Sequence, residues 1–275
     1  MEENTWTVTS PQVIDVDGVR ALKLGIVRGR FDVVTHDEDV ARIEVSEISG
    51  DPLAVSLVNG RLEVRHQLHG AQGWFKNLMG TVNHNSNNAV VISIALPAGV
   101  EVEAGTVSGD GMVSGISGHS RLSTVSGSVL ADGTSGELAV NTVSGEVIAR
   151  NHHGVLTARS VSGEVTASGE FTNIRANTVS GDLSFDLQGY TRDFGANSVS
   201  GDVTIRLPHD VGVDIVAKSA SGAVIIDDQK YAQPGGTVQT IAGPDAQLML
   251  VRTNSVSGKT SIFHSQPSVD TEQAR

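Results

Sequence analysis

The sequence predicts an all-β fold, and more specifically a parallel β-solenoid with two short strands in each coil of about 18 residues. Three observations lead to this prediction. A Val-Ser-Gly motif recurs at a spacing of 18 residues, apolar and polar residues alternate after each motif, and aromatic residues make up only 4% of the 275 residues. A fixed period stacks each strand on its counterpart, the alternation gives each strand one buried face, and the scarcity of rings indicates a thin core of small aliphatic side chains.

The repeat is centred on a glycine. Five copies of the motif follow at intervals of 18 residues, and weaker copies stand halfway between them at Gly118, Gly136 and Gly154. Later copies are spaced by 20 and 21 residues, and a longer insertion precedes the last one. The glycines of the series are Gly109, Gly127, Gly145, Gly163, Gly181, Gly201, Gly222 and Gly258. We interpret them as structural residues on the inward side of a strand, where a side chain would crowd the opposite wall or oppose a local bend.

The residues after each glycine define the strands. Apolar residues stand two and four positions later, as at Val147 and Ala149, and polar residues lie between them. This alternation is typical of a strand with one buried face. Valine is therefore expected to stack on valine and alanine on alanine at about 4.8 Å per coil.

We expect three parts along the chain. Residues 1–100 form irregular coils that cap the solenoid, with a tight turn at Val58-Asn59-Gly60 and an inserted loop at residues 66–89. Residues 101–264 form the regular coils, with an insertion at residues 227–254, and residues 265–275 form a disordered tail. A cap is needed because an open end of a solenoid exposes unpaired backbone groups.

Composition excludes several classes of function. The chain has no cysteine, which excludes disulfides, thiolate zinc sites and cysteine nucleophiles. The net charge of -12 argues against a nucleic-acid partner or an anionic membrane. The first residues contain no apolar signal segment, and residues 89–100, the longest apolar stretch, are too short to span a bilayer. From sequence we therefore expect a cytoplasmic protein that does not insert into membranes.

The sequence predicts no catalytic residue, no cofactor and no metal site. It shows no nucleophile elbow, phosphate-binding loop or carboxylate pair, and the repeated serine belongs to the lattice of the repeat. His66, His69 and His84 lie close together in the inserted loop and would suit zinc, but no carboxylate of matching spacing accompanies them. We interpret them as polar loop residues and the protein as a non-enzyme, with a glycan-active enzyme as the remote alternative.

Three surface features are candidates for binding. The acidic ladder, Glu146, Glu164, Asp182 and Asp202, would either gather divalent cations or form a solvated edge that discourages aggregation, and we prefer the second interpretation. The hydroxyl ladder would either bind ice or a glycan, or stiffen the stack through hydrogen bonds between coils. Its pairs are Thr106/Ser108, Thr124/Ser126, Thr142/Ser144, Ser160/Ser162, Thr178/Ser180 and Ser198/Ser200. Trp74 and Phe75 in the inserted loop would either contact a ligand or pack against the core.

The recurring Thr-Val-Ser-Gly-(Asp/Glu)-Val unit, found at residues 142–147 and, with serine first, at 160–165 and 198–203, resembles a bacterial family of adhesin-like β-strand repeats. That family is known as a domain of unknown function. Residues 16–19 and 31–34 are also similar to its opening strands, and the resemblance covers about residues 10–263. The resemblance implies a β-solenoid and an adhesive or cell-envelope role, and it supplies no catalytic residues.

Our leading hypothesis is a non-enzymatic adhesin-like or scaffold protein whose ladder faces bind a protein or a polysaccharide. This hypothesis requires exposure outside the cell. The alternative is a structural protein of the cytosol that associates end to end into homo-oligomers, as stacked solenoids do. The two hypotheses differ in cellular location and in oligomeric state.

Overall fold

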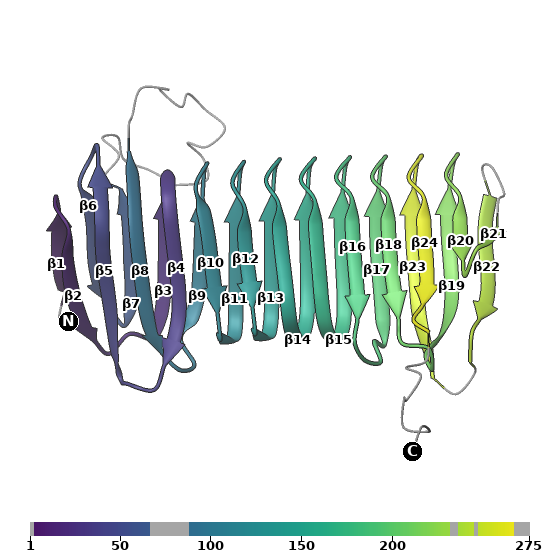
Figure 1. The fold of residues 1–275 in the computed structure, drawn as a ribbon, viewed down its shortest axis with the longest axis horizontal. Helices are drawn as coiled ribbons and strands as arrows, with labels where there is room; N and C mark the ends of the chain where they lie inside the picture. The colour runs from purple at the N-terminus through teal and green to yellow at the C-terminus, as the bar shows by residue number, and fades with distance from the viewer. Residues whose placement is uncertain (1–2, 67–87, 232–235, 245–246, 267–275) are drawn as a thin grey trace, which may run out of the picture. The chain divides into compact units, whose positions relative to one another are not determined.

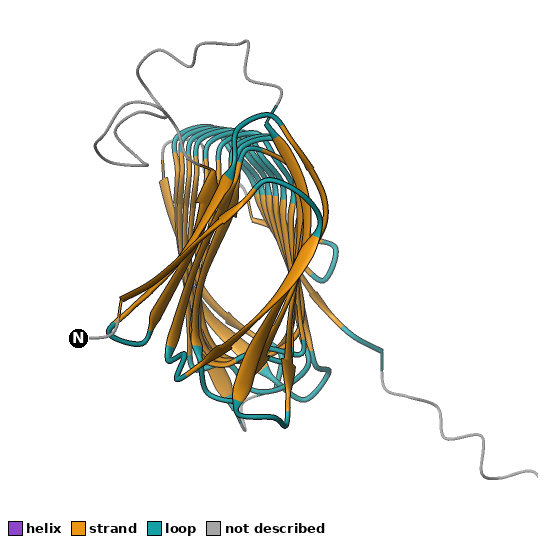
Figure 2. Cartoon of the chain, turned by 90° about the vertical axis from the view of Figure 1, so that its left-hand side faces the viewer, coloured by secondary structure: helices purple, strands orange, loops and turns teal. Residues whose placement is uncertain are grey.

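The computed structural model describes residues 3–66, 88–231, 236–244 and 247–266 (Figure 1). The prediction of an all-β fold is confirmed: strands make up 70% of the structure and the described residues form no helix (Figure 2). The chain divides into two compact units, Met1–Ser135 and Gly136–Arg275. Trp74, Phe75, His69 and His84 lie outside the described residues, as do most of the predicted inserted loop and tail. The three-part division of the chain stays a prediction.

The first unit contains twelve complete described strands that form two runs. One run has the order β1–β6–β7–β3–β9–β11 and the other has the order β2–β5–β8–β4–β10–β12. The strands are β1 (Glu3–Val8), β2 (Gln12–Asp17), β3 (Ala21–Ile26), β4 (Arg28–His36), β5 (Val40–Ser49), β6 (Leu53–Val58), β7 (Arg61–His66), β8 (Ala89–Pro97), β9 (Glu101–Thr106), β10 (Asp110–Ser114), β11 (Ser117–Thr124) and β12 (Val129–Asp132).

Pairing in the first unit is parallel only in part. The pairs β7–β3, β3–β9, β8–β4 and β4–β10 are parallel. β10 also pairs in parallel with β12 at the expected offset of 18 residues, with Gly111 opposite Val129. The pairs β1–β6, β6–β7, β2–β5 and β5–β8 are antiparallel. The expectation of parallel coils throughout is therefore wrong for the start of the chain. For β6–β7 the reason is local, because the Asn59-Gly60 turn has positive φ at both residues and reverses the chain into a hairpin.

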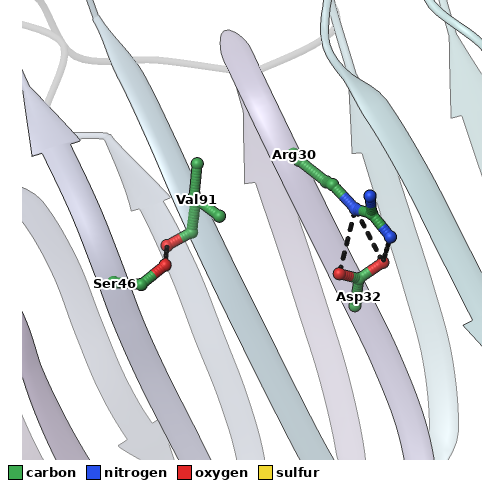
Figure 3. A network of polar contacts seen from close by, with 4 residues as sticks. All are labelled: Arg30, Asp32, Ser46 and Val91. Atoms are coloured by element: carbon green, nitrogen blue, oxygen red, sulfur yellow. Dashed lines mark hydrogen bonds and ion pairs between the residues drawn. The ribbon is translucent and has the colours of Figure 1, made fainter.

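Two local features shape the outer surface of the first unit (Figure 3). On β4, the Arg30 guanidinium donates to Asp32, with Nε 3.0 Å from Oδ2, and this hydrogen bond raises the pKa of Arg30. On β5, Ser46 is the extra residue of a bulge, since Val45 and Glu47 face successive residues of β8. The Ser46 hydroxyl donates to the Val91 carbonyl at 3.3 Å.

The second unit is built mainly of parallel pairs. Val147 on β14 lies beside Val165 on β15, which in turn lies beside Leu183 on β16, and Leu183 lies beside Val203 on β18. The 18-residue offset of the first two pairs and the 20-residue offset of the third thus appear as strand register. The strands are β14 (Val147–Ser160), β15 (Val165–Thr178), β16 (Leu183–Leu187), β17 (Asp193–Ser198), β18 (Val203–Leu207), β19 (Gly212–Ser219), β20 (Val224–Ile226), β21 (Gln229–Tyr231), β22 (Gly236–Ala242), β23 (Leu248–Ser255) and β24 (Thr260–His264), while β13 (Ser135–Thr142) begins at the boundary between the units.

The last parallel strands do not follow chain order. β23 pairs with β17 on one side and with β19 on the other, and β24 likewise lies between β18 and β20. Figure 1 shows this pair in yellow between green strands. The sequence led us to expect that each coil stacks on the one before it, and that expectation is wrong for residues 212–226. Their place is taken by residues 248–264.

The core of both units is mainly aliphatic, and it includes four phenylalanines. Val147, Val165 and Leu183 are fully buried, as the alternation predicts. The expectation of a core without large rings is wrong, however, because Phe31, Phe171 and Phe194 are also fully buried. In the first unit, space for Phe31 comes from Gly111, its partner on β10, since a side chain there would collide with the ring.

Candidate binding surface

The motif glycines lie in bends between strands, not within strands as we expected from the sequence. Gly163, for example, stands between the end of β14 and the start of β15. A Cβ at Gly163 would lie within 3.0 Å of the carbonyl oxygen of Gly145 on the adjacent coil, far closer than a side chain tolerates. The same applies to Gly181, Gly201, Gly222 and Gly258, and in the first unit to Gly127 and Gly109. The glycines are therefore required by close backbone stacking of neighbouring turns, and not by the opposite wall.

The first hydroxyl of each turn is buried and closes that turn. The Thr142 hydroxyl donates to the Gly145 carbonyl at 2.7 Å, and the Thr178 hydroxyl donates to the Gly181 carbonyl at 2.8 Å. In the first unit, the Thr124 hydroxyl both donates to the Gly127 carbonyl and accepts from its N–H. Ser160, Ser198 and the half-buried Ser255 make the same contact with the glycine three residues later. This half of the hydroxyl ladder faces inward and is closed to a ligand.

The second hydroxyl of each turn links neighbouring coils. The Ser162 hydroxyl donates to the Val143 carbonyl at 3.1 Å, and the Ser180 hydroxyl donates to the Val161 carbonyl at 3.3 Å. Ser200, Ser221 and Ser257 repeat this bond on the later coils, and Ser108 and Ser126 do so in the first unit. In the sequence analysis, hydrogen bonds between coils were the alternative to ligand binding by the hydroxyl ladder, and these contacts are such bonds. The donor of each hydroxyl is already used.

The first residue of the motif forms a row of exposed apolar side chains that the sequence analysis did not identify. In the second unit the side chains of this row are 42% to 53% exposed. Its members, which we call the valine ladder, are Val143, Val161, Val179, Val199 and Val256. The signal was present in the sequence, since an apolar residue recurs at an outward position once per coil. Our interpretation of the motif considered the role of its glycine and not that of its valine.

The backbone fixes the spacing of the valine ladder. The N–H of Ser180 donates to the Val161 carbonyl at 2.8 Å, and the N–H of Ser257 donates to the Val199 carbonyl at 2.9 Å. Such bonds hold successive turns at the usual strand separation of about 4.8 Å. The valines therefore form a continuous apolar row on a rigid support.

An amide ladder runs beside the valine ladder. The Asn197 side-chain N–H donates to the Asn177 Oδ1 at 2.9 Å, and the Asn254 side-chain N–H donates to the Asn197 Oδ1 at 2.8 Å. These residues precede the buried hydroxyl residue in each turn and point outward. The side-chain oxygens of Asn177 and Asn197 are thus engaged within this ladder.

Two carboxylates of the acidic ladder accept hydrogen bonds from the backbone of the next coil. Asp182 Oδ1 accepts the N–H of Asp202 at 2.9 Å, and Asp202 Oδ1 accepts the N–H of Lys259 at 2.8 Å. Lys259 Nζ is also 3.8 Å from Asp202 Oδ2 and ends the row with a positive charge. Glu146 and Glu164 are exposed on the preceding coils. Within the described parts of the chain, no group of three or more His, Asp or Glu residues is placed to hold a metal ion.

A histidine–aspartate pair closes the end of the second unit. The His264 ring contacts the Asp227 carboxylate through Nδ1 at 2.6 Å and the Val211 carbonyl through Nε2 at 2.8 Å. Both ring nitrogens are thus engaged with protein oxygens. The pair joins the end of β24 to the strands beside it and is not arranged as a general base.

The first unit has a shallow depression of about 200 Å³ on the outer face of β3, β7, β9 and β11. Lys23, Arg61 and Arg121 line it together with Glu101 and Glu103. Lys23 Nζ lies 4.0 Å from Glu103 Oε2. Because the charges of both signs alternate across the strands, the depression presents no field of one sign to a charged ligand.

His66 is the one member of the predicted histidine cluster that the structure describes. It is buried at the end of β7, opposite Leu53 on β6, and neither ring nitrogen has a hydrogen-bond partner there. Burial lowers the pKa of His66, and the charge of Asp51 opposes this effect. His66 therefore packs as a neutral core residue.

The described residues contain no helix that is long and apolar enough to cross a membrane. The chain matches none of the curated proteins. Among solved structures, a proposed lipid-binding protein of Parabacteroides distasonis is 14% identical with a TM-score of 0.55, over 94% of this chain and 97% of that chain. Proposed adhesins of Parabacteroides distasonis and Parabacteroides merdae are 10% and 11% identical, each with a TM-score of 0.51 over 96% of this chain and 97% of theirs.

These likenesses concern the fold alone. The family model described as Toastrack DUF4097 matches residues 23–262, which is most of the chain. The resemblance to adhesin-like proteins of unknown function is thus confirmed. The chain belongs to the Toastrack DUF4097 family.

Proposed function

We propose that this protein is a non-enzymatic, adhesin-like binding module that uses its valine ladder to hold an extended segment of another protein. The observation that carries the proposal is the row of valines, each 42% to 53% exposed, that repeats once per coil in the second unit. Single exposed apolar residues are common on soluble proteins, but a contiguous row of them is typical of an interaction surface.

The support beneath the ladder favours binding. The turns are held by backbone hydrogen bonds, by a buried hydroxyl in each turn and by a serine that bonds to the next coil, as at Thr178 and Ser180. A rigid surface loses little conformational entropy when a ligand docks. We infer that the repeats act as a parallel β-solenoid scaffold whose turns present the ladder.

The chemistry of the surface favours a protein ligand over a polysaccharide. Sugars are recognised mainly through hydrogen bonds to their hydroxyls, and the serine and asparagine side chains beside the valines already bond within the protein, as at Ser180 and Asn197. The apolar row itself gains most by burying aliphatic side chains of a partner. A polysaccharide ligand is the competing outcome of the test below.

The similar structures support a binding role of this general kind. The three similar structures named above are proposed adhesins and a proposed lipid-binding protein, and none of the three is described as an enzyme. An adhesive role also requires that the protein reaches the cell envelope. Protease treatment of intact cells, followed by detection of this chain, tests that requirement.

Two variants test the role of the ladder. Val179→Lys places a charge at the middle of the row, and Val155→Lys places the same charge at an exposed valine of β14 outside the row. Purified wild type and both variants are incubated with arrays of extracellular proteins and of polysaccharides. We expect wild type and Val155→Lys to retain the same protein ligands and Val179→Lys to lose them.

Binding that Val179→Lys leaves unchanged would show that the ladder is not the binding surface. Binding to polysaccharides alone would show that the ligand is a glycan and not a protein. Circular dichroism of the three proteins controls for folding, since an exposed valine contributes little to the core.

A further inference from the structure

Among the described strands, β22 stands at an edge of the second unit. β22 pairs over its whole length with β19 in antiparallel register, from Gly236 opposite Ser219 to Ala242 opposite Val213. In the described part of the chain, no strand pairs with the other edge of β22. Its outer N–H and C=O groups therefore point away from the described sheet, as on an edge strand that a further strand can join.

The sequence of β22 does not protect this edge. Natural edge strands are usually blunted by charge, by proline or by a bulge. β22 reads Gly-Thr-Val-Gln-Thr-Ile-Ala, with no charge and no proline, and its register with β19 shows no shift. By contrast, β2 in the first unit, which pairs only with β5 among the described strands, carries Asp15 and Asp17.

The side chains of β22 also indicate a missing neighbour. The inward residues of β19 are buried, whereas Val238 and Thr240, which lie beside them on β22, are only half-buried. On the outer face Ile241 is 57% exposed. A further strand at this edge would cover apolar surface on both faces of β22.

We propose that β22 pairs in antiparallel fashion with β22 of a second copy of this chain, so that two sheets join into one across a two-fold axis. A self-pair of this kind places each residue opposite its mirror position in the strand. The register centred on Gln239 is the one in which all seven residues are paired. Val238 then lies opposite Thr240 of the second copy, and Thr237 lies opposite Ile241 of the second copy.

Charge favours a second copy at this edge. The whole chain has a net charge of -12, so two copies repel one another over most of their surface, but the paired strands carry no charge. Next to β22, Asp214 lies beside Ile241 and Lys218 lies beside Thr237 on β19. In the joined sheet, Asp214 of one copy therefore shares a row with Lys218 of the other, and no like charges share a row.

Light scattering during size-exclusion chromatography tests the proposal on the full chain. We expect a concentration-dependent dimer for wild type. Gln239→Lys places two lysines opposite each other at the two-fold axis and should raise the dimer dissociation constant about tenfold or more. Val155→Lys, with the same new charge on the interior strand β14, should leave the dimer unchanged.

Single cysteines test the register, because the natural chain has none. Under mild oxidation Gln239→Cys should form a covalent dimer by itself. Thr237→Cys and Ile241→Cys should form one when mixed and little when alone, since Cα atoms more than about 7 Å apart do not form a disulfide.

Three results would overturn the proposal. They are a wild type that stays monomeric at all concentrations, a dimer that Gln239→Lys does not weaken, and cysteine pairs that react without regard to register. A monomer that becomes a dimer when residues 267–275 are removed would assign the edge to this chain's own C-terminal segment, and the proposal would also be wrong.

Discussion

Gly258 stacks directly on Gly201, although four described strands, β19 to β22, lie between β18 and β23 in sequence. A Cβ at Gly258 would lie within 3.0 Å of the Gly201 carbonyl oxygen, and a Cβ at Gly222 would in turn meet the Gly258 carbonyl oxygen. The spatial order of these turns is therefore Gly201, Gly258 and Gly222. The last coil of the repeat is inserted between two coils that are consecutive in sequence.

Engineered disulfides can check this order. Val199 and Val256 lie on adjacent turns, since the N–H of Ser257 donates to the Val199 carbonyl at 2.9 Å. Adjacent turns are about 4.8 Å apart, which is within the Cα separation that a disulfide spans. We expect Val199→Cys/Val256→Cys to form an intramolecular disulfide on oxidation, detected as a mobility shift on non-reducing gels.

Val199→Cys/Ala220→Cys is the control for that experiment. Ala220 lies one turn further along, because its N–H donates to the Ser255 carbonyl. The two cysteines would be about 10 Å apart, beyond the reach of a disulfide. Ready formation of this second disulfide would favour stacking in chain order.

Substitution of a motif glycine should destabilise the second unit. In Gly163→Ala the new methyl group meets the Gly145 carbonyl, which belongs to a hydrogen-bonded turn and cannot move freely. We expect a loss of about 3 kcal/mol in the free energy of unfolding, measured by urea denaturation. Gly195→Ala is the matched control, because a Cβ there has only one neighbour within 4 Å, at 3.9 Å. Equal stability of both variants would contradict the stacking of the turns.

The regular part of the fold could be predicted because one unit of sequence is repeated there. The glycine spacing and the alternation of Val147 and Ala149 with polar residues correctly predicted strands in 18-residue register with buried apolar faces. The Asn59-Gly60 turn was also predicted, because positive φ is readily adopted by just these residues.

The remaining features depend on interactions that a single sequence does not display. The place of β23 between β17 and β19 is a matter of long-range pairing, and both possible orders satisfy the same local pattern. Phe194 was not expected in the core, because the scarcity of rings indicated a core of small aliphatic side chains. In the structure it packs edge to face against Phe185, with the ring centroids 5.1 Å apart. The valine ladder went unrecognised because the motif has a structural role that accounts for its glycine and serine and leaves its valine unexplained.

The position of the buried hydroxyl in each turn should tolerate replacement of threonine by serine but not by valine. In Thr178→Val the hydrogen bond to the Gly181 carbonyl, 2.8 Å long, is lost while the shape of the side chain is kept. We expect a loss of about 1–2 kcal/mol in the free energy of unfolding. Thr178→Ser should cost less, because serine makes the same bond at Ser160 and Ser198. A larger loss for serine than for valine would exclude this role of the hydroxyl.

Truncation of a buried ring should be among the most damaging changes in the second unit. Phe194→Ala removes a fully buried ring and its edge-to-face contact with Phe185. We expect a loss of about 3–5 kcal/mol in the free energy of unfolding. Phe263→Ala, at a position that is 37% exposed, should cost clearly less. Similar losses for the two variants would show that Phe194 does not anchor the core.

The burial of His66 should make the first unit less stable in mild acid. The unfolded chain takes up a proton near the ordinary pKa of 6.5, whereas burial lowers the pKa of His66 in the folded protein. Below about pH 6.5 the unfolded state therefore binds more protons at this residue, and the free energy of unfolding decreases as the pH falls. His66→Leu removes this proton and should flatten the decrease between pH 6.5 and pH 5. Urea denaturation of both proteins at several pH values measures the difference, and at pH 8, where the imidazole is neutral in both states, their difference reports packing alone. Parallel pH profiles for wild type and His66→Leu would mean that His66 is protonated as readily in the folded protein as in the unfolded chain.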